Sequence, residues 1–573
     1  MIKSNSFDRL DDYLRMLAVH IPLGAFIGLS VVIIHEIYVL LTEQYAHFTH
    51  ENSVFLVIFP VIAILAAYFI VTLLTGAPTG GGSHRLLEVY HYKGGKMTLR
   101  STIFEPLASS VTIGLGGSAG FEGPSLLLGG GLGSYIGQRL KLPTDELSTI
   151  LICGAAAGVS AIFKAPLTGI MFALEIPYQR DIYREAFIPA TIASASSYIV
   201  AVTLSGAEKV FPILPEFELS SMISLHSLAI GIIAGLLSIL FVTLSEKMRV
   251  LKTKVKLHGS IIALLGGLAI GVSSLYYPNI AGTGYETIRG LLTGELNRPV
   301  SWVVMLLIVK MLATSITLTM GGSGGVFVPT LFVGATLGKL YTLLVPGSGD
   351  SSIIIVAAMA AMISASNKTL LTSVALVAET TGPSSVAYTL LASVTSYFIS
   401  GNTSFYGHVQ PEKELLEEEE GLHTIFHHLE TEHRELLNGV KVKDLLRYDS
   451  LTLDPDMSPK DAINRVSSYP FSVYPLVSKG KLVGSITLED ILFMYDNDVP
   501  KIDVPNPTPL TAEMNESLRE LIDSLIEGEF DCVFVVDGDS HEYRGFISET
   551  DITLKLLELL KQTMNEAKVT YKK

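Results

Sequence analysis

Apolar and polar residues are distributed very unevenly along this chain of 573 residues. Up to about Phe405 long apolar runs dominate, and from Pro411 onward the sequence is rich in charged residues. Many of these runs approach or reach the roughly 20 residues that a helix needs to span the hydrocarbon core of a membrane. They are Met16–Leu41, Val54–Leu74, Leu147–Phe163, Ala186–Thr203, Ser224–Leu244, Ile261–Leu275, Trp302–Thr319, Ile353–Ser364 and Val386–Ile399. The pattern predicts a polytopic all-α membrane protein with a soluble C-terminal part.

The composition supports this interpretation and excludes some partners. Hydrophobic residues make up 49% of the chain and charged residues 17%, with a mean hydropathy of +0.46. A net charge of −15 argues against nucleic acid as a partner. Cys153 and Cys532 are the only cysteines, so the sequence offers no disulfide framework. We expect no metal site and no enzymatic activity, because no metal-ligand cluster or nucleophile–base pair is recognisable.

Two shorter, glycine-rich segments of the membrane part repeat each other. GFEGPSLLLGGGLG begins at Gly120 and GVFVPTLFVGATLG begins at Gly325, and their glycines, prolines and leucines match at a constant offset of 205 residues. Downstream, the segments Lys164–Glu175 and Lys368–Glu379 share Lys, Leu-Thr and Glu at an offset of 204. Two matches in the same order indicate a duplicated membrane domain. Duplicated halves with short, interrupted helices are typical of transporters whose site lies near the bilayer midplane.

The physical chemistry of these segments predicts an anion as the transported species. A helix that begins inside the membrane presents unpaired N–H groups and the positive end of its dipole. Pro124 and Pro329 suit an early helix position, where a missing N–H removes no hydrogen bond. The preceding Gly120 and Gly325 let the backbone turn and approach a ligand closely. We therefore expect two half-helix N-termini to converge on one anion.

Glu122 is the charged difference between the two matched segments. A carboxylate inside a membrane segment is costly and is usually retained for function. One interpretation is a helix cap, since the dipole favours glutamate in a first turn. The other is that deprotonated Glu122 occupies the place of the anion and that protonation releases it. The second interpretation links anion passage to a proton, or at least to pH.

These segments resemble the CLC family of chloride channels and chloride/proton antiporters. Gly120–Pro124 (GFEGP) is similar to the family's G(K/R)EGP motif, and Gly325–Pro329 (GVFVP) to its GxFxP motif. Ala165–Gly169 and Ser404–Gln410 also resemble family segments. The resemblance implies an inverted internal repeat, a homodimer with one anion path per subunit, and Glu122 as the gating and proton-coupling residue. It also implies an anion site around Gly81, Ser83, Gly120, Phe121, Gly123, Gly325, Val326, Phe327 and Tyr406.

Within that site the resemblance gives particular roles to three residues and leaves one position open. The backbone N–H groups of Val326 and Phe327 and the hydroxyl of Tyr406 would bind the anion. The family's GSGIP motif would fall near Gly80–His84, which places Gly81 where a serine hydroxyl usually binds the central anion. Either Ser83 supplies that hydroxyl or the site uses only backbone groups and Tyr406. Chloride is the expected anion, and fluoride, nitrate and other halides stay open.

Two further departures from the family concern proton coupling. Phe121 stands where the motif has a basic residue beside the gate. Ile176 stands where many antiporters have a second, internal glutamate that relays protons, directly after Glu175. Family members with an aliphatic residue there are often passive channels, although some antiporters lack the glutamate too. Glu175 itself we expect to be structural, as a paired or capping carboxylate.

The charged C-terminal part resembles a tandem pair of CBS modules. A strand–helix–strand–strand–helix pattern occurs twice, and each unit ends in Gly-x-Ile-(Thr/Ser)-x-x-Asp. In such pairs the Ser/Thr and Asp residues can hold the ribose of a nucleotide, here Thr487, Asp490, Ser548 and Asp551. The same residues are also good helix caps, so binding of an adenine nucleotide (ATP, ADP or AMP) is one of two interpretations. No cofactor is required.

The predicted organisation places the membrane domain at 1–410, with repeat halves at about 15–205 and 222–406. An acidic helical linker at 411–439 follows, then CBS modules at 440–500 and 501–565, and a tail at 566–573. We expect a multi-pass protein of the cell membrane with cytoplasmic CBS modules. Three functions are compared: a proton-coupled anion antiporter, a passive CBS-gated channel, and a nucleotide sensor with a membrane anchor. An anchor needs no broken helices, which disfavours the third.

Overall fold

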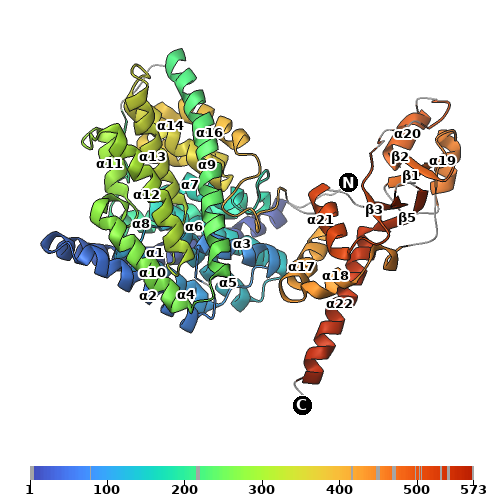
Figure 1. The fold of residues 1–573 in the computed structure, drawn as a ribbon, viewed down its shortest axis with the longest axis horizontal. Helices are drawn as coiled ribbons and strands as arrows, with labels where there is room; N and C mark the ends of the chain where they lie inside the picture. Colours follow the sequence, from blue (N-terminus) through green and yellow to red (C-terminus); the bar gives the residue numbers. More distant parts are fainter. Residues whose placement is uncertain are drawn as a thin grey trace. The chain divides into compact units, whose positions relative to one another are not determined.

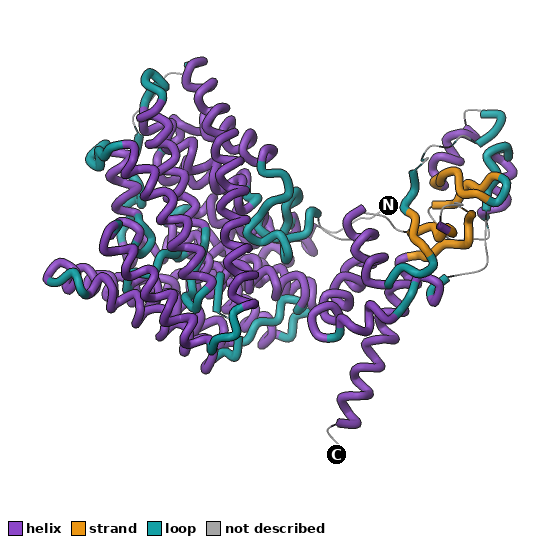
Figure 2. Tube along the Cα trace, viewed as in Figure 1, coloured by secondary structure: helices purple, strands orange, loops and turns teal. Residues whose placement is uncertain are grey.

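The computed structural model divides into two compact units, Met1–Glu414 and Leu415–Lys573. It describes residues 6–77, 79–214, 220–413, 417–446, 452–467, 473–496, 499–502, 504, 506, 508–528, 532–538 and 542–570. The last three residues of the predicted tail, 571–573, therefore lie outside the described residues, and the preceding ones continue the final helix. Figure 1 shows the helices of the first unit and the mixed second unit, and Figure 2 shows that the described strands all belong to the second.

The first unit consists of helices joined by short connections. Its first half contains α1 Ser6–Glu51, α2 Phe55–Leu74, α3 Gly82–Tyr92, α4 Leu99–Gly114, α5 Glu122–Leu140, α6 Thr144–Phe163, α7 Pro166–Glu175 and α8 Phe187–Ser205. Its second half contains α9 Ser221–Lys254, α10 Gly259–Tyr276, α11 Tyr285–Thr293, α12 Val300–Thr319, α13 Phe327–Leu344, α14 Ser351–Asn367, α15 Leu370–Thr381 and α16 Val386–Ile399. Short 3-10 turns lie at Arg184–Ala186, Pro278–Ile280 and Pro383–Ser385.

Within the described residues, eight helices are long and apolar enough to cross a membrane. Helices α7 and α15 are shorter apolar helices of 10 and 12 residues, and at about 1.5 Å per residue neither reaches across a hydrocarbon core of about 30 Å. The architecture is therefore a polytopic all-α membrane protein that mixes full and partial spans.

The two halves of the first unit are built alike. Helix α5 packs on α6 and α6 on α8, and in the second half α13 packs on α14 and α14 on α16. The repeated glycines have a packing role here: a Cβ on Gly129 would come within 2.1 Å of the Gly154 carbonyl oxygen, and one on Gly334 within 2.6 Å of Met359 Cα. Small residues let membrane helices approach closely. The repeat in the sequence is thus a repeat of helix packing.

The repeated lysines end equivalent helices. Lys164 after α6 and Lys368 after α14 both adopt left-handed backbone conformations, with φ of 51° and 59°. Their ammonium groups bind near the ends of the following long helices: Lys164 Nζ donates to the Ser205 carbonyl at 3.0 Å, and Lys368 Nζ to the Ser400 hydroxyl at 2.6 Å. These contacts stabilise helix C-termini, where positive charge is favoured.

The second unit contains one five-stranded sheet of order β1-β2-β5-β4-β3. Its helices are α17 Glu417–Glu432, α18 Arg434–Gly439, α19 Pro459–Val466, α20 Leu488–Asp496, α21 Leu518–Gly528 and α22 Glu549–Thr570, with a 3-10 turn at Val442–Asp444. Its strands are β1 Val473–Ser478, β2 Lys481–Thr487, β3 Thr511–Glu513, β4 Cys532–Asp537 and β5 Glu542–Ser548. The hairpins β1–β2 and β4–β5 are equivalent antiparallel pairs, and β2 meets β5 where Lys481 pairs with Glu542.

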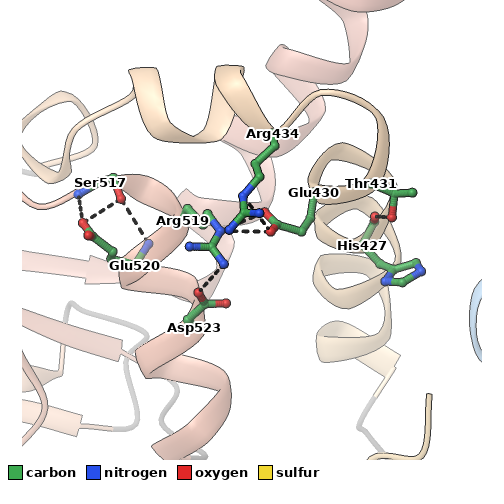
Figure 3. Close-up of polar contacts among 8 residues, drawn as sticks. All are labelled: His427, Glu430, Thr431, Arg434, Ser517, Arg519, Glu520 and Asp523. Carbon is green, nitrogen blue, oxygen red and sulfur yellow. Dashed lines mark hydrogen bonds and ion pairs between the residues drawn. The ribbon is translucent and has the colours of Figure 1, made fainter. Parts of the chain in front are cut away.

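The acidic helix α17 is part of the second unit and is not solvated on all sides. Leu422 and Leu429 are buried in one cluster with Leu556 and other residues of α22. On its polar face, Glu430 accepts from Arg519 Nε of α21 at 3.0 Å and pairs with Arg434 at 3.2 Å (Figure 3). Arg519 also pairs with Asp523 at 3.5 Å. The charged segment after the membrane part is therefore anchored to the soluble unit by an apolar seam and an ion-pair cluster.

Candidate functional site

The two repeated glycine motifs meet at the centre of the first unit. Gly120 and Gly325 exchange both backbone hydrogen bonds, Gly120 N to Gly325 O and Gly325 N to Gly120 O, each at 2.8 Å. This antiparallel bridge relates the two repeat halves by an approximate two-fold axis. Helix α5 begins at Glu122 and α13 at Phe327, directly after the bridge. Two helix N-termini are thus brought together, as the sequence predicted.

The side chain of Glu122 reaches across to the N-terminus of the other helix. Its Oε1 accepts a hydrogen bond from the Phe327 N–H at 2.6 Å, and the carboxylate also faces the amides of Gly123 and Val328. The residue is fully buried, and its Oε2 has no hydrogen-bond partner. The carboxylate therefore faces backbone N–H groups at the starts of both α5 and α13, where those groups would receive an anion.

Glycine is required around this carboxylate. A Cβ on Gly120 would come within 2.1 Å of Glu122 Oε2, and a Cβ on Gly325 within 2.0 Å of Oε1. Any larger residue at either position would displace the carboxylate. The glycines of the two motifs therefore define a cradle shaped for the Glu122 carboxylate.

Two unpartnered hydroxyls lie beside the cradle. Ser83 on α3 and Tyr406 are 2% and 3% exposed, neither hydroxyl makes a hydrogen bond, and the two face each other. Ser83 Oγ lies 3.2 Å from the position of a Cβ on Gly123, so the pair adjoins the start of α5. Buried hydroxyls without partners are unfavourable unless a ligand completes them, and both are suited to donate to an anion.

Gly81 and Ser83 occupy different positions at the start of α3. Gly81 is the N-cap of α3 and forms a parallel bridge with Gly324. Ser83 lies in the first turn, where its side chain reaches Tyr406. Ser83 is therefore the residue of this turn whose hydroxyl lies beside Tyr406, while Gly81 offers backbone groups alone; whether an anion uses the Ser83 hydroxyl stays a prediction.

Phe121 places an apolar aromatic ring where the family motif has a basic side chain. Phe121 is 3% exposed and packs on Tyr38 at a centroid distance of 5.0 Å and edge-on to His35 at 6.2 Å. His35, in the first long apolar run, is thus held in an aromatic cluster behind the gate.

Comparison with known proteins agrees with this geometry. The model of the family described as "Voltage gated chloride channel" matches residues 61–401, which is more than half of the chain. The chain belongs to the voltage gated chloride channel family. The CBS domain model matches twice, at residues 442–496 and 501–558. This is a multi-pass membrane protein of the chloride channel family in which two CBS domains follow the membrane part.

The chain is also similar to individual relatives and to solved structures. A "Putative chloride channel protein ClcB-like" of Ralstonia nicotianae is 29% identical over 329 residues, covering 55% of this chain and 75% of that protein. A CLC-type fluoride/proton antiporter shares the fold with a TM-score of 0.62 at 22% identity, over 71% of this chain and 100% of that one. A slow cyanobacterial Cl−/H+ antiporter does so with a TM-score of 0.62 at 19% identity, over 69% and 97%.

The internal position at which many members of the chloride channel family have a glutamate is closed and apolar here. Ile176 ends α7 and is fully buried, and the Gln410 side chain donates to its carbonyl at 2.9 Å. Neighbouring Glu175 is bound by three donors of α15, the N–H groups of Leu371 and Thr372 and the Thr372 hydroxyl, at 2.6–2.7 Å. Glu175 is therefore the structural cap that the sequence analysis expected.

The four CBS residues singled out from the sequence are helix caps in this structure. Thr487 Oγ1 donates to Asp490 Oδ2 at 2.7 Å and accepts from the Asp490 N–H at 3.0 Å. Ser548 and Asp551 form the same pair at 2.6 and 3.3 Å. The structure thus brings each Ser/Thr–Asp pair together at a strand-to-helix junction, as the motif predicted, with both carboxylates engaged locally.

A cavity of about 110 Å³ adjoins the first of these caps. Thr487 and Asp490 line it together with Asn506, Cys532 and Phe534, so both CBS modules contribute. It is smaller than the roughly 300–1,000 Å³ of typical small-molecule sites. A nucleotide would therefore have to widen it.

A polar cluster beside the anion site was not recognised from the sequence. His408 Nε2 lies 2.8 Å from His84 Nε2 and 2.9 Å from Arg249 Nη1. His84 directly follows Ser83, and His408 is two residues after Tyr406. No sequence signal connects histidines 324 residues apart. The cluster adjoins the start of α3 and the last residues of the first unit.

Proposed function

We propose that this chain is a proton-coupled antiporter of a small monovalent anion, with chloride as the first candidate and Glu122 as the gate. The observation that carries the proposal is the hydrogen bond from Phe327 N–H to Glu122 Oε1 within the glycine cradle. The deprotonated carboxylate accepts hydrogen bonds from the backbone amides that an anion would otherwise bind. Protonation removes its charge and weakens that bond, since charged acceptors bind N–H groups more strongly than neutral ones.

In this mechanism the residues act in a defined order. Protonated Glu122 leaves the N-terminus of α13, and an anion takes the amides of Val326 and Phe327. The hydroxyls of Ser83 and Tyr406 donate to the anion on the side of the His84–His408 cluster. Loss of the proton returns the carboxylate to the cradle and expels the anion. Exchange follows because the anion and the carboxylate compete for the same donors.

The two antiporters described above share the fold of this chain, which supports the proposal of proton coupling. They transport different anions according to their titles. The solved structures are titled as a fluoride/proton and a Cl−/H+ antiporter. The two hydroxyls at this site are neutral donors that any small anion accepts. Chloride is preferred here because the family and the ClcB-like relative carry that name.

A passive, CBS-gated anion channel is the second candidate function, and Ile176 is the observation that favours it. The position carries no titratable side chain, so no proton reaches Glu122 through it. In such a channel Glu122 would still respond to pH, but no proton would be carried across. In either function we propose that the chain works as a homodimer, and that an adenine nucleotide at the CBS pair adjusts the flux.

Flux measurements on the purified chain in proteoliposomes separate these functions. Liposomes with a chloride gradient are followed with a chloride electrode while external pH is recorded. Uphill proton movement driven by chloride is the expected result. Chloride current without proton movement would establish the channel instead. Repeating the assay with fluoride and nitrate gradients ranks the anions.

A further inference from the structure

Three glutamates are buried among the described residues of the membrane unit: Glu105, Glu122 and Glu175. Both oxygens of Glu175 are engaged by α15. Glu105 and Glu122 each keep one oxygen, Oε1 and Oε2 respectively, without a hydrogen-bond partner. A buried carboxylate with a free oxygen is costly, and one of the two is already assigned as the gate. The other has no role in the mechanism described so far.

Glu105 lies on α4 and faces charged groups that reach solvent. It is 7% exposed and interacts electrostatically with Arg85 and Glu88 of α3 and with Lys93 at its end. Arg85 pairs with Glu88 at 2.8 Å and Lys93 with Glu88 at 2.6 Å, and these side chains are 24–41% exposed. The Arg85 Nε is also buried without a partner. Arg85 Nε is a donor and Glu105 Oε1 an acceptor, and buried water is the usual partner of such unsatisfied groups.

The solvent at this end of α4 lies on the side from which the chain leaves for the CBS unit. Arg85 follows His84, whose ring contacts His408 at 2.8 Å. His408 lies six residues before the end of the first unit at Glu414. Glu105 interacts electrostatically with Arg85, which links it to this part of the first unit.

The remaining elements packed on α4 carry few titratable groups near Glu105. Helix α1 approaches the opposite end of α4, where Gly114 adjoins the Tyr38 carbonyl, and it carries His35 and Tyr38 there. Helix α2 carries Tyr68 as its titratable side chain, and α5 contributes Glu122. On α4 itself, the side chain of Ser101 hydrogen-bonds to the Glu105 carboxyl group.

Toward the interior, buried hydroxyls continue from Glu105 to the gate. Ser109 lies one turn further along α4. Its hydroxyl donates to the backbone carbonyl of Glu105 at 2.9 Å and lies 2.9 Å from Ser323 Oγ. Ser323 precedes Gly324 and Gly325, and Gly325 is the residue against which Glu122 Oε1 lies. The Ser109 and Ser323 hydroxyls are within hydrogen-bond distance of each other, and water is required to connect them to the carboxylates of Glu105 and Glu122.

We propose that Glu105 is the internal proton-transfer residue of this chain, taking the role that the Ile176 position cannot perform. The step is a proton transfer alone: the O–H bond of Glu105 breaks as that of Glu122 forms, with the proton passing along Ser109, Ser323 and intervening water. Glu105 then takes its next proton from water beside Arg85 and Glu88. The proposal rests on the proton-coupled antiport proposed above.

The test compares Glu105→Gln with wild type in proteoliposomes that record anion and proton flux together. We expect proton flux to fall by at least about tenfold, as for loss of an acid–base group, while anion flux stays within about threefold. Glu105→Asp, which keeps a titratable group, should restore part of the proton flux. Glu185→Gln, which changes an exposed carboxylate outside this cluster, should leave the proton-to-anion ratio unchanged.

The outcomes distinguish this inference from the function on which it rests. A wild-type protein that moves no protons overturns the antiporter and the relay together. A coupled wild type with an equally coupled Glu105→Gln variant overturns the relay alone, as does an uncoupled Glu105→Asp or an uncoupled Glu185→Gln. If Glu105→Gln fails to fold, Ser323→Ala decides: reduced proton flux with normal anion flux supports the relay, and unchanged coupling overturns it.

Discussion

Glu175 on α7 and Glu379 on α15 each cap the N-terminus of the helix that carries the other. Glu175 accepts from the Leu371 and Thr372 amides at 2.7 Å, and Glu379 accepts from the Leu167 and Thr168 amides at 3.0 and 2.7 Å. Each also accepts from the threonine hydroxyl. This reciprocity follows from the inverted repeat, because the same Thr and Glu recur 204 residues apart. Two short helices that cannot span the membrane are thereby locked to each other.

Glu175→Gln should destabilise the membrane unit. The amide keeps the volume but loses the charge, and its NH2 group opposes one backbone donor; hydrogen bonds to charged groups are worth about 1.5–3 kcal/mol. We expect a lower melting temperature in detergent. Glu379→Gln should have a smaller effect because Glu379 is only half-buried, and the exposed Glu185→Gln is the control. A melting temperature equal to that of the control would contradict the capping role.

Neutralising the gate should remove the pH dependence of anion flux. In wild type, flux should rise as pH falls, because protonation releases Glu122 from the Phe327 amide. Glu122→Gln should give a flux that is the same across the pH range and should abolish proton movement. Glu286→Gln on α11, an exposed carboxylate, is the control. A variant whose flux still follows pH as in wild type would remove Glu122 from the gating mechanism.

Much of the membrane architecture was predictable from local pattern. Apolar runs marked most of the long helices, and the paired Gly-x-x-x-Pro segments marked the two N-termini that meet at Gly120 and Gly325. These features depend on neighbouring residues in the sequence. Contacts across the repeat were not predictable in the same way. Two such contacts are the proximity of Ser83 to Tyr406 and the contact of His84 with His408. Both depend on where α3 begins and on how the segment after α16 packs against it.

Glu105 shows most clearly what could not be predicted from the sequence. It lies in a short mixed segment, LRSTIFEPLASS, with no motif around it, and a single glutamate there is indistinguishable from a surface residue. Its burial arises only when α4 packs on α1, α2 and α5, and its row of hydroxyls arises when Ser323 of the loop before α13 meets Ser109. Similarly, the acidic residues of α17 predicted only a charged helical linker, whereas Leu422 and Leu429 pack this helix into the second unit.

Anion affinity should depend on the two unpartnered hydroxyls. Ser83→Ala and Tyr406→Phe each remove one donor, and a neutral hydrogen bond contributes about 0.5–1.5 kcal/mol, so chloride binding should weaken about 2- to 12-fold for each. Calorimetric titration of the purified protein with chloride measures this. Ser53→Ala, which removes an exposed hydroxyl outside the site, is the matched control. Unchanged affinity in both hydroxyl variants would exclude them from the site.

Nucleotide binding, if it occurs at the cavity, should depend on one module more than on the other. Asp490→Asn should reduce ATP or AMP affinity of the full chain by at least about tenfold, because a carboxylate accepts ribose hydroxyls more strongly than an amide. Asp551→Asn removes the equivalent cap without touching the cavity lining. Both variants should lose about 1 kcal/mol of capping stability. Equal affinity for nucleotide in wild type and Asp490→Asn would assign Asp490 to capping alone.

The attachment of α17 to the second CBS module should depend on Arg519 and Glu430. These side chains are 27% and 25% exposed and 3.0 Å apart, so their interaction is partly screened and worth about 0.5–1 kcal/mol. A double-mutant cycle with Arg519→Ala and Glu430→Ala should yield a coupling energy of that size in chemical unfolding of the full chain. Lys501 and Asp456, an exposed pair at 2.8 Å, provide the comparison cycle, with a smaller expected coupling. If α17 transmits the state of the CBS pair, Arg519→Ala should also reduce any effect of nucleotide on anion flux. Full nucleotide sensitivity in this variant would assign the ion pair to stability alone.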